Sequence, residues 1–175
     1  MIFRAPGKCF LSLTGNNTVL KIKFYWIGET KDKKLQGFEQ DFLARIKRYV
    51  PAEIASVTEQ KKKDPRSSSA QMVREGRKLL AMIPRGAQLV VLDETGKNHS
   101  SRELAAWLEK SLAGGSQELA FVVGGYQGIP EELKNKADKI LSLSRMTFPH
   151  EIARTLLLEQ VYRAISINMN LPYHK

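Results

Sequence analysis

Cysteine and histidine are scarce in this sequence, which has one cysteine, Cys9, and three widely separated histidines. A single cysteine excludes an internal disulfide and a cysteine-based zinc site, and the spacing of the histidines does not indicate a metal cluster. Long apolar runs are also missing, and none approaches the ~18 residues that a membrane span needs. We therefore expect a protein without metal or membrane segment, in the reducing setting of the cytoplasm.

The common phosphate-binding motifs are absent too. The stretch LAFVVGGYQGIPEEL, residues 119–133, places Gly124 and Gly125 after an apolar run, as α/β proteins do at a ligand site. It is not G-x-G-x-x-G, however, and no G-K-[ST] follows it. If these glycines make room for a ligand, the pattern favours neither a dinucleotide nor a nucleoside triphosphate.

Acidic residues are few beside the basic ones: 18 stand against 28, which gives a net charge of +10. Such a surplus favours a polyanionic partner, because lysine and arginine on phosphates release counterions. Nucleic acid is the first expectation and an anionic membrane surface the second. The 42% of hydrophobic residues and the length of 175 residues are typical of one globular domain.

Apolar periodicity alternates along the chain between the two-residue repeat of strands and the helical repeat. This alternation predicts an α/β domain with a largely parallel sheet. Ser100 and Glu103 form a capping-box pattern at one helix start, and Gly114 with Gly115 marks its end. Strands are expected at 21–28, 53–59, 88–93, 118–123 and 139–144, and the main helices at 35–49, 72–83, 101–113 and 151–167.

The segments that follow the last three strands are the candidate ligand site. They read LDETGK, VVGGYQG and SLSRMTFPH, and we expect all three to be irregular beyond the strand ends. Ligands of parallel sheets bind beyond the carboxyl ends of the strands. Since the three segments meet at one edge, they predict one site.

The last helix, 151–167, is apolar around most of its circumference. A helix of this kind is covered on both sides. The second cover could be another subunit, or the helix could be central to the core of one chain.

At this point the sequence resembles a known family. The run FVVGGYQGIPEEL…SLSRMTFPHEIARTLLLEQVYRAISI…YHK is similar to the RlmH group of SPOUT methyltransferases, bacterial enzymes that methylate a pseudouridine in large-subunit ribosomal RNA. LKIKFYWIGETK at 20–31 and LVVLDETGK at 89–97 extend the likeness over residues 20–175. Residues 1–19 lie outside it and could be a targeting peptide, although we expect an N-terminal extension.

The resemblance implies a single-domain SPOUT sheet flanked by helices, with a C-terminal trefoil knot. It also implies a homodimer that holds S-adenosyl-L-methionine in the knot. Glycine allows close backbone approach to such a ligand because it has no Cβ. The implied cofactor-binding residues are Leu92, Gly124, Gly125, Leu143, Ser144, Arg145, Met146, Thr147 and Phe148.

The resemblance further implies methyl transfer to N3 of a pseudouridine, which must lose its proton. The candidates for catalysis are His150, Arg154, Arg163, Tyr173 and His174. His150 could be the base, since histidine titrates near neutral pH, or could cap the long helix. Arg154 shares its helical face, where it could meet a phosphate or the developing anion. Arg163 lies on the opposite face, where it could serve a second subunit or simply pair with Glu159.

The tail residues Tyr173 and His174 could close over the substrate base, or they could be a frayed terminus. KKKDPR at 61–66, with Lys31, Lys33 and Lys34, could contact RNA or form a solvated face. The family suggests an assembled ribosomal particle as substrate. The rivals are another SPOUT enzyme, acting on tRNA or on a ribose hydroxyl, and a non-catalytic RNA-binding protein of the same fold.

Overall fold

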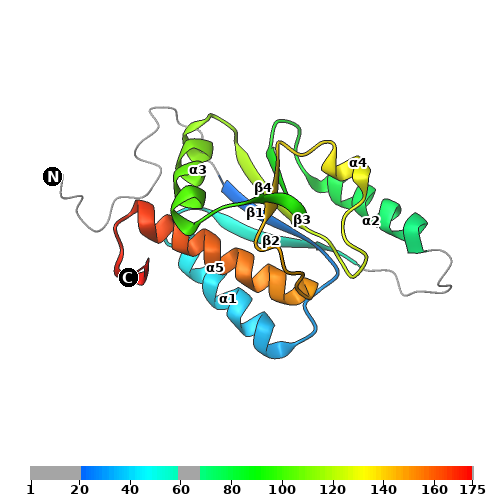
Figure 1. Cartoon of the computed structure of the whole chain (residues 1–175), viewed down its shortest axis with the longest axis horizontal. Coiled ribbons are helices and arrows are strands. Elements are labelled where there is room, and N and C mark those ends of the chain that lie inside the picture. Colours follow the sequence, from blue (N-terminus) through cyan, green and yellow to red (C-terminus); the bar gives the residue numbers. More distant parts are fainter. Residues whose placement is uncertain (1–20, 59–67, 175) are drawn as a thin grey trace.

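The computed structural model describes residues 21–58 and 68–174, and its strands and helices alternate along the chain (Figure 1). This alternation and the fold class agree with the sequence-based prediction. The elements are β1 (Lys21–Ile27), α1 (Lys33–Lys47), β2 (Ala52–Val57), α2 (Ser68–Met82), β3 (Gln88–Asn98), α3 (Ser101–Ala113), β4 (Glu118–Val123), α4 (Glu131–Lys134), β5 (Lys139–Ser142), α5 (His150–Asn168) and the short 3-10 helix η3 (Pro172–His174).

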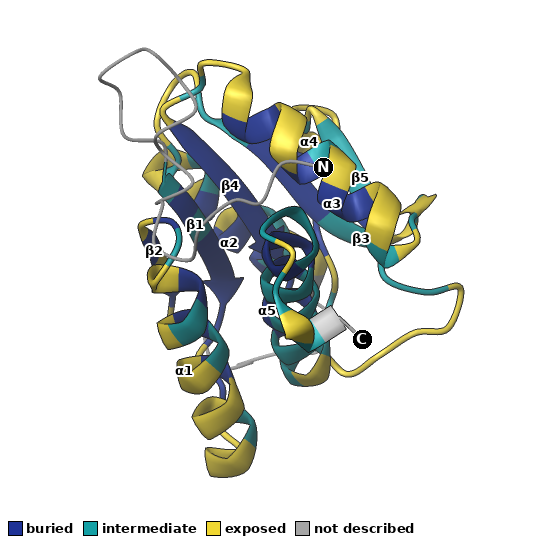
Figure 2. Cartoon of the chain, turned by 90° about the vertical axis from the view of Figure 1, so that its left-hand side faces the viewer, coloured by how far each residue is buried: buried dark blue, intermediate teal, exposed yellow. Residues whose placement is uncertain are grey.

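The strands form one five-stranded parallel sheet in the order β2-β1-β4-β3-β5. Two apolar clusters cover its faces. The larger one lies under α1, α3 and α5, and the smaller one under α2 and α4. Figure 2 shows the strands as the buried centre of the molecule. β4, in the middle, is buried at every residue, which explains the unbroken apolar run that follows its first residue, Glu118.

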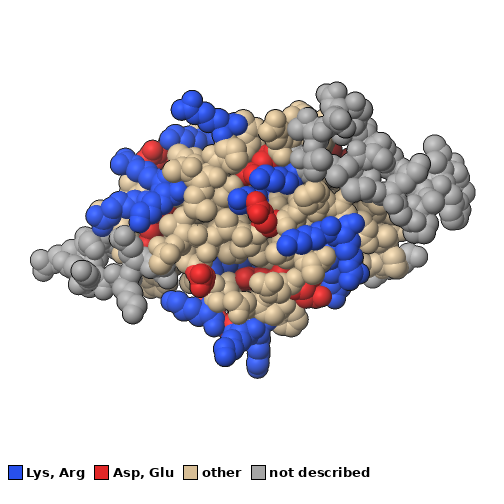
Figure 3. All heavy atoms as spheres, turned by 180° about the vertical axis from the view of Figure 1, so that it is seen from behind, with Lys and Arg blue, Asp and Glu red and all other residues tan. Residues whose placement is uncertain are grey.

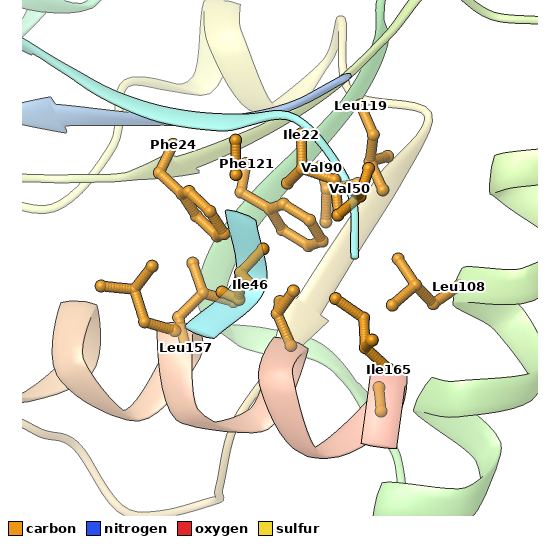
Figure 4. Packing of buried hydrophobic residues seen from close by; sticks show 14 of the residues in the cluster. Ile22, Phe24, Ile46, Val50, Val90, Leu108, Leu119, Phe121, Leu157 and Ile165 are labelled. Carbon is orange, nitrogen blue, oxygen red and sulfur yellow. The ribbon is translucent and has the colours of Figure 1, made fainter. Parts of the chain in front are cut away.

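The larger cluster is organised by aromatic side chains on neighbouring strands. Phe24 on β1 pairs in register with Phe121 on β4, and their rings stack at 5.6 Å between centroids. Trp107 on α3 meets Phe121 edge-on at 6.2 Å. Leu157 and Ile165 of α5 reach into the same cluster (Figure 4).

Helix α5 lies between α1 and α3 on this face of the sheet (Figure 2). Its residues from Arg154 to Ser166 include seven buried positions. Both flanks of the helix are thus covered within one chain, which accounts for much of its apolar circumference.

The largest error among the predicted boundaries concerns the end of β3. The segment after Asp93 was expected to be a loop, but β3 continues to Asn98 after an irregularity between Leu92 and Lys97. The extension pairs with β5, and Asn98 donates a hydrogen bond to Ser142 Oγ (3.0 Å). A Cβ on Gly96 would lie 2.8 Å from the backbone of Ile140, so only glycine allows the two strands to approach this closely. Because the partner strand is distant in sequence, the local pattern gave no sign of it.

The predicted capping box of α3 is confirmed. Glu103 N–H donates to Ser100 Oγ (3.2 Å), and the Glu103 carboxylate accepts from Ser100 N–H (2.7 Å). Gly114 is the C-cap of the same helix, as its position predicted. These local contacts fix where α3 begins and therefore where β3 must stop.

Candidate functional site

A cavity of about 660 Å³ opens at the carboxyl edge of the sheet, a volume within the usual range for small-molecule sites. The segments after β3, β4 and β5 form its wall, so the predicted convergence of three segments is present in the fold. The lining residues are Leu92–Thr95, Val123–Ile129, Leu141–Ser144 and Met146–His150, with Lys134 and Ala153.

Most of the residues predicted to bind a cofactor line this cavity. Those that do are Leu92, Gly124, Gly125, Leu143, Ser144, Met146, Thr147 and Phe148. Arg145 is exposed and does not belong to the wall. Hydrogen bonds shape the loop: Ser142 Oγ donates to the Ser144 carbonyl (2.7 Å), and Met146 N–H donates to Ser144 Oγ (2.9 Å).

The paired glycines line the cavity, but the space left by their missing Cβ atoms is used by the loop itself. A Cβ on Gly124 would collide with the backbone of Gly128 and lie 2.8 Å from Ile129. A Cβ on Gly125 would lie 3.1 Å from Ile27 Cγ2. Gly128, with φ of 81°, donates its N–H to the Gly125 carbonyl (3.0 Å). The glycines therefore let the turn close on itself and present backbone groups as a wall.

The mouth of the cavity is lined by large apolar side chains in contact with solvent. Tyr126 is 74% exposed, Met146 70% and Phe148 36%. Exposed apolar side chains gathered around a cavity mark a surface that a ligand or partner covers. An aromatic ring and a thioether suit a flat, weakly polar group such as a purine.

One wall carries a balanced pair of charges. Lys134 Nζ lies 2.7 Å from Asp93 Oδ2, and both side chains are mostly buried. Burial alone would raise the pKa of Asp93, but hydrogen bonds from Lys134 and Thr95 outweigh it, so this pKa is below its usual value. The hydrogen bond to Asp93 raises the pKa of Lys134. The pair is therefore fully ionised at neutral pH.

His150 and Arg154 share one helix face but differ in environment. His150, the first residue of α5, lines the cavity. Arg154 is 0% exposed and donates to the Ile27 carbonyl (2.6 Å) and to Thr30 Oγ1 (3.1 Å). Thr30 in turn donates to the buried carboxylate of Glu39 (2.7 Å). Arg154 thus holds the turn after β1 and does not line the cavity.

A second contact ties the same turn to α5. Glu151 accepts hydrogen bonds from the backbone N–H groups of Lys31 (3.0 Å) and Asp32 (3.2 Å). The turn between β1 and α1 is therefore fixed by both Glu151 and Arg154, from the first two turns of α5. Ile27, at its start, packs against Gly125 in the cavity wall.

Arg163 and Tyr173 gather around Glu159, away from the cavity. Arg163 donates to Glu159 from Nη2 (2.6 Å), and Tyr173 donates to the same carboxylate (3.1 Å). The guanidinium lies 5.0 Å from the Tyr173 ring centroid. The predicted pairing of Arg163 with Glu159 is present. His174 belongs to η3, and its side chain is outside the described part of the structure.

Arg163 stands thirteen positions after His150, a rise of about 20 Å along a helix. Arg163 and Tyr173 are also absent from the cavity lining. Within one chain, these two side chains therefore do not share a site with His150.

Sequence reasoning did not select Tyr126 or Lys134, both of which line the cavity. Tyr126 follows the paired glycines directly, and that position was a usable signal. Lys134 has no such signal in the sequence, because only the packing of α4 near the end of β3 brings it to Asp93. The basic segment 61–66 lies outside the described residues.

Within residues 21–58 and 68–174, no group of three or more His, Cys, Asp or Glu side chains is arranged to hold a metal ion. In the same described part, no helix combines the length and apolarity needed to cross a bilayer. On the face shown in Figure 3, lysines and arginines form separate groups with acidic residues between them, and uncharged residues make up much of the surface.

Solved structures share the fold. A "probable methyltransferase" from Bordetella pertussis Tohama I superimposes with a TM-score of 0.55 at 13% identity, over 85% of this chain and 98% of that one. A "probable methylase family protein" from Haemophilus influenzae Rd KW20 does so with a TM-score of 0.51 at 13% identity, over 85% and 68%. At this identity the likeness concerns the fold alone.

Relatives found by sequence are more similar to this chain than these solved structures are. "Ribosomal RNA large subunit methyltransferase H" of Geotalea daltonii is 41% identical over 155 residues, covering 89% of this chain and 99% of the relative. The protein of the same name from Symbiobacterium thermophilum is 41% identical over 161 residues, covering 89% and 100%. The family model described as "Predicted SPOUT methyltransferase" matches residues 20–174. The resemblance drawn from the motifs is thereby confirmed, and the chain belongs to the SPOUT methyltransferase family.

Proposed function

We propose that this chain uses S-adenosyl-L-methionine to methylate N3 of a pseudouridine in large-subunit ribosomal RNA, on the assembled ribosome and in the cytoplasm. The observation that carries the proposal is the near-complete match, at about 40% identity, to relatives named for methylation of this RNA. The cavity supports it, because its wall is built from the segments that carry the family motifs.

The residues present fit the methyl donor. Backbone groups of Leu143 to Phe148 and the 124–128 turn would hold its adenosine part against Leu92. Asp93 and Lys134 offer opposite charges, which suits a zwitterionic amino-acid part. When bound, the donor supplies an electrophilic methyl group on a sulfonium. The enzyme's own contribution is to hold donor and acceptor at reacting distance.

His150 is the residue that we assign to the proton on N3. It lines the cavity, and an imidazole can accept a proton near neutral pH. Arg154 is assigned a positioning role, since it is buried against Ile27 and Thr30. It acts on the site through the turn after β1.

Arg163 and Tyr173, with the tail residue His174, would act across a homodimer. Arg163 and Tyr173 are far from the cavity of their own chain along α5, so we propose that they reach the cavity of a second chain. The exposed Met146, Phe148 and Ile152 near the start of α5 are apolar surface that such a partner would cover.

A trefoil knot in the C-terminal part is also proposed. It is supported by the membership of the chain in the SPOUT methyltransferase family. An experimental backbone trace in which the C-terminal segment does not pass through a loop would refute it.

The test uses the whole protein with a methyl donor labelled on its transferable methyl. We expect label in ribosomal RNA when intact ribosomes are supplied, and little with free large-subunit RNA or tRNA. Digestion of the RNA and mass spectrometry should locate the methyl group on one pseudouridine. Label on tRNA or on a ribose would contradict the proposal, and so would donor binding without any transfer.

A further inference from the structure

Three basic residues lie at the open edge of the sheet, outside the cavity wall: Lys97, His99 and Lys139, here called the edge cluster. β5 is the outermost strand, and Lys97 pairs with its residue Leu141. Paired residues on neighbouring strands point to the same face, and side chains repeat every second position. Lys97 and Lys139 therefore share the face covered by α3, and His99 follows two positions later.

Two residues of the edge cluster, His99 and Lys139, are partly buried, and Lys97 is exposed. The Lys139 ammonium lies 5.1 Å from the centroid of the Trp107 ring, a favourable contact that leaves its charge unneutralised. Burial, followed by the charge of Lys97, lowers the pKa of Lys139. Burial and both lysines lower the pKa of His99. Nε2 of His99 is buried and has no hydrogen-bond partner among the described residues.

No carboxylate within the described residues forms an ion pair with Lys97 or Lys139. The acidic group that acts on His99 is Glu103, and it is already hydrogen-bonded to Ser100 N–H (2.7 Å) and Oγ (2.8 Å) in the capping box. Basic groups crowded without a counter-charge cost free energy. An anion bound between them would offset this cost.

We propose that the edge cluster binds a backbone phosphate of the RNA substrate. The inference rests on the proposed function and adds the place where the RNA strand is held. Leu141 and Ser142, two and three residues after Lys139, line the cavity. A strand whose base enters the cavity would thus pass along this edge of the sheet. Ammonium groups suit a phosphate as compact point charges.

The test is the double variant Lys97→Gln/Lys139→Gln, measured for binding to a fluorescently labelled fragment of large-subunit ribosomal RNA. We expect affinity about tenfold weaker near 0.1 M salt, and a slope of log K against log salt smaller by about 1.5. The variant Lys97→Arg/Lys139→Arg keeps the charges and should retain both values. Lys78→Gln/Arg85→Gln is the matched control, since it removes the same charge from exposed positions outside the edge cluster.

Unchanged affinity and salt slope in the glutamine variant would overturn the inference, and so would an equal effect in the matched control. Calorimetry with S-adenosyl-L-methionine should give the wild-type affinity for every variant, because the cluster is outside the cavity. The RNA measurement requires no methyl transfer. A wild type that binds RNA through the cluster but transfers no methyl group would refute the proposed function and leave this inference intact.

Discussion

At the scale of single residues, Arg154 illustrates how burial decides a role. Its guanidinium is enclosed by the Ile27 carbonyl, Thr30 and the nearby carboxylate of Glu39. Burial raises the pKa of Glu39, and the Thr30 hydroxyl and Arg154 oppose that rise. The position of Arg154 in the sequence predicted contact with the substrate. Spacing shows on which face of a helix a residue lies, but it does not show what covers that face.

We expect Arg154→Met to lower the free energy of unfolding by about 3–5 kcal/mol, since it leaves buried polar groups without their cation. The pKa of Glu39 would then rise further. When the pKa of a carboxyl is higher in the folded state, the folded protein loses stability as the pH rises above the unfolded-state pKa of 4.5 and through the folded-state pKa. Urea unfolding should therefore show a larger loss at pH 8 than at pH 5.

Two controls accompany this measurement. Adding Glu39→Gln to Arg154→Met should recover part of the stability and remove the added pH dependence. Arg163→Met, which breaks an ion pair whose arginine is 31% exposed, should cost about 1 kcal/mol or less. Equal losses for the two arginines would contradict the positioning role of Arg154.

At the scale of elements, the pairing of β3 with β5 brings the cavity walls together. Gly96 permits the approach, and the paired residues Leu141 and Ser142 line the site. Gly96→Ala should lower stability by about 1–3 kcal/mol, because its Cβ would press on backbone that cannot easily move. Calorimetry should also show weaker binding of S-adenosyl-L-methionine. Gly37→Ala on α1, where a Cβ meets nothing within 4 Å, should instead stabilise by about 0.5–1 kcal/mol.

An alanine at position 96 that leaves both stability and donor binding unchanged would show that the close approach is dispensable.

The elements also show which structural features the sequence could predict and which it could not. Capping by Ser100 and Glu103 is local, so it was predictable. The extension of β3 depends on a partner more than forty residues away, so its local polar sequence read as a loop.

At the scale of the whole molecule, the layers and the edge that carries the site followed from the alternation of periodicities. The strand order β2-β1-β4-β3-β5 did not, because apolar patterns carry no information on which strands are neighbours. The glycine-rich segment was placed correctly at the cavity. The contacts of Lys134 and Arg154 arise only from tertiary packing, so they could not be predicted from the sequence.

The proposed homodimer predicts that two inactive variants restore each other. His150→Ala and Arg163→Ala should each be nearly inactive as pure dimers. In a random mixture, half the dimers are mixed, and one cavity in each has an intact His150 beside the partner's intact arginine. Methyl transfer to ribosomes should recover to about one quarter of the wild-type rate. No recovery after subunit exchange would mean that both residues serve one chain's own cavity.

The contacts by which α5 holds the turn between β1 and α1 have a consequence for biosynthesis. Glu151 and Arg154 hold the residues after β1, and the segment from Met146 to His150 closes the cavity. A nascent chain in which α5 has not yet left the ribosomal exit tunnel has neither the anchor nor the closing wall. Such a chain cannot yet methylate ribosomal RNA, and its activity begins only once α5 has emerged and packed between α1 and α3.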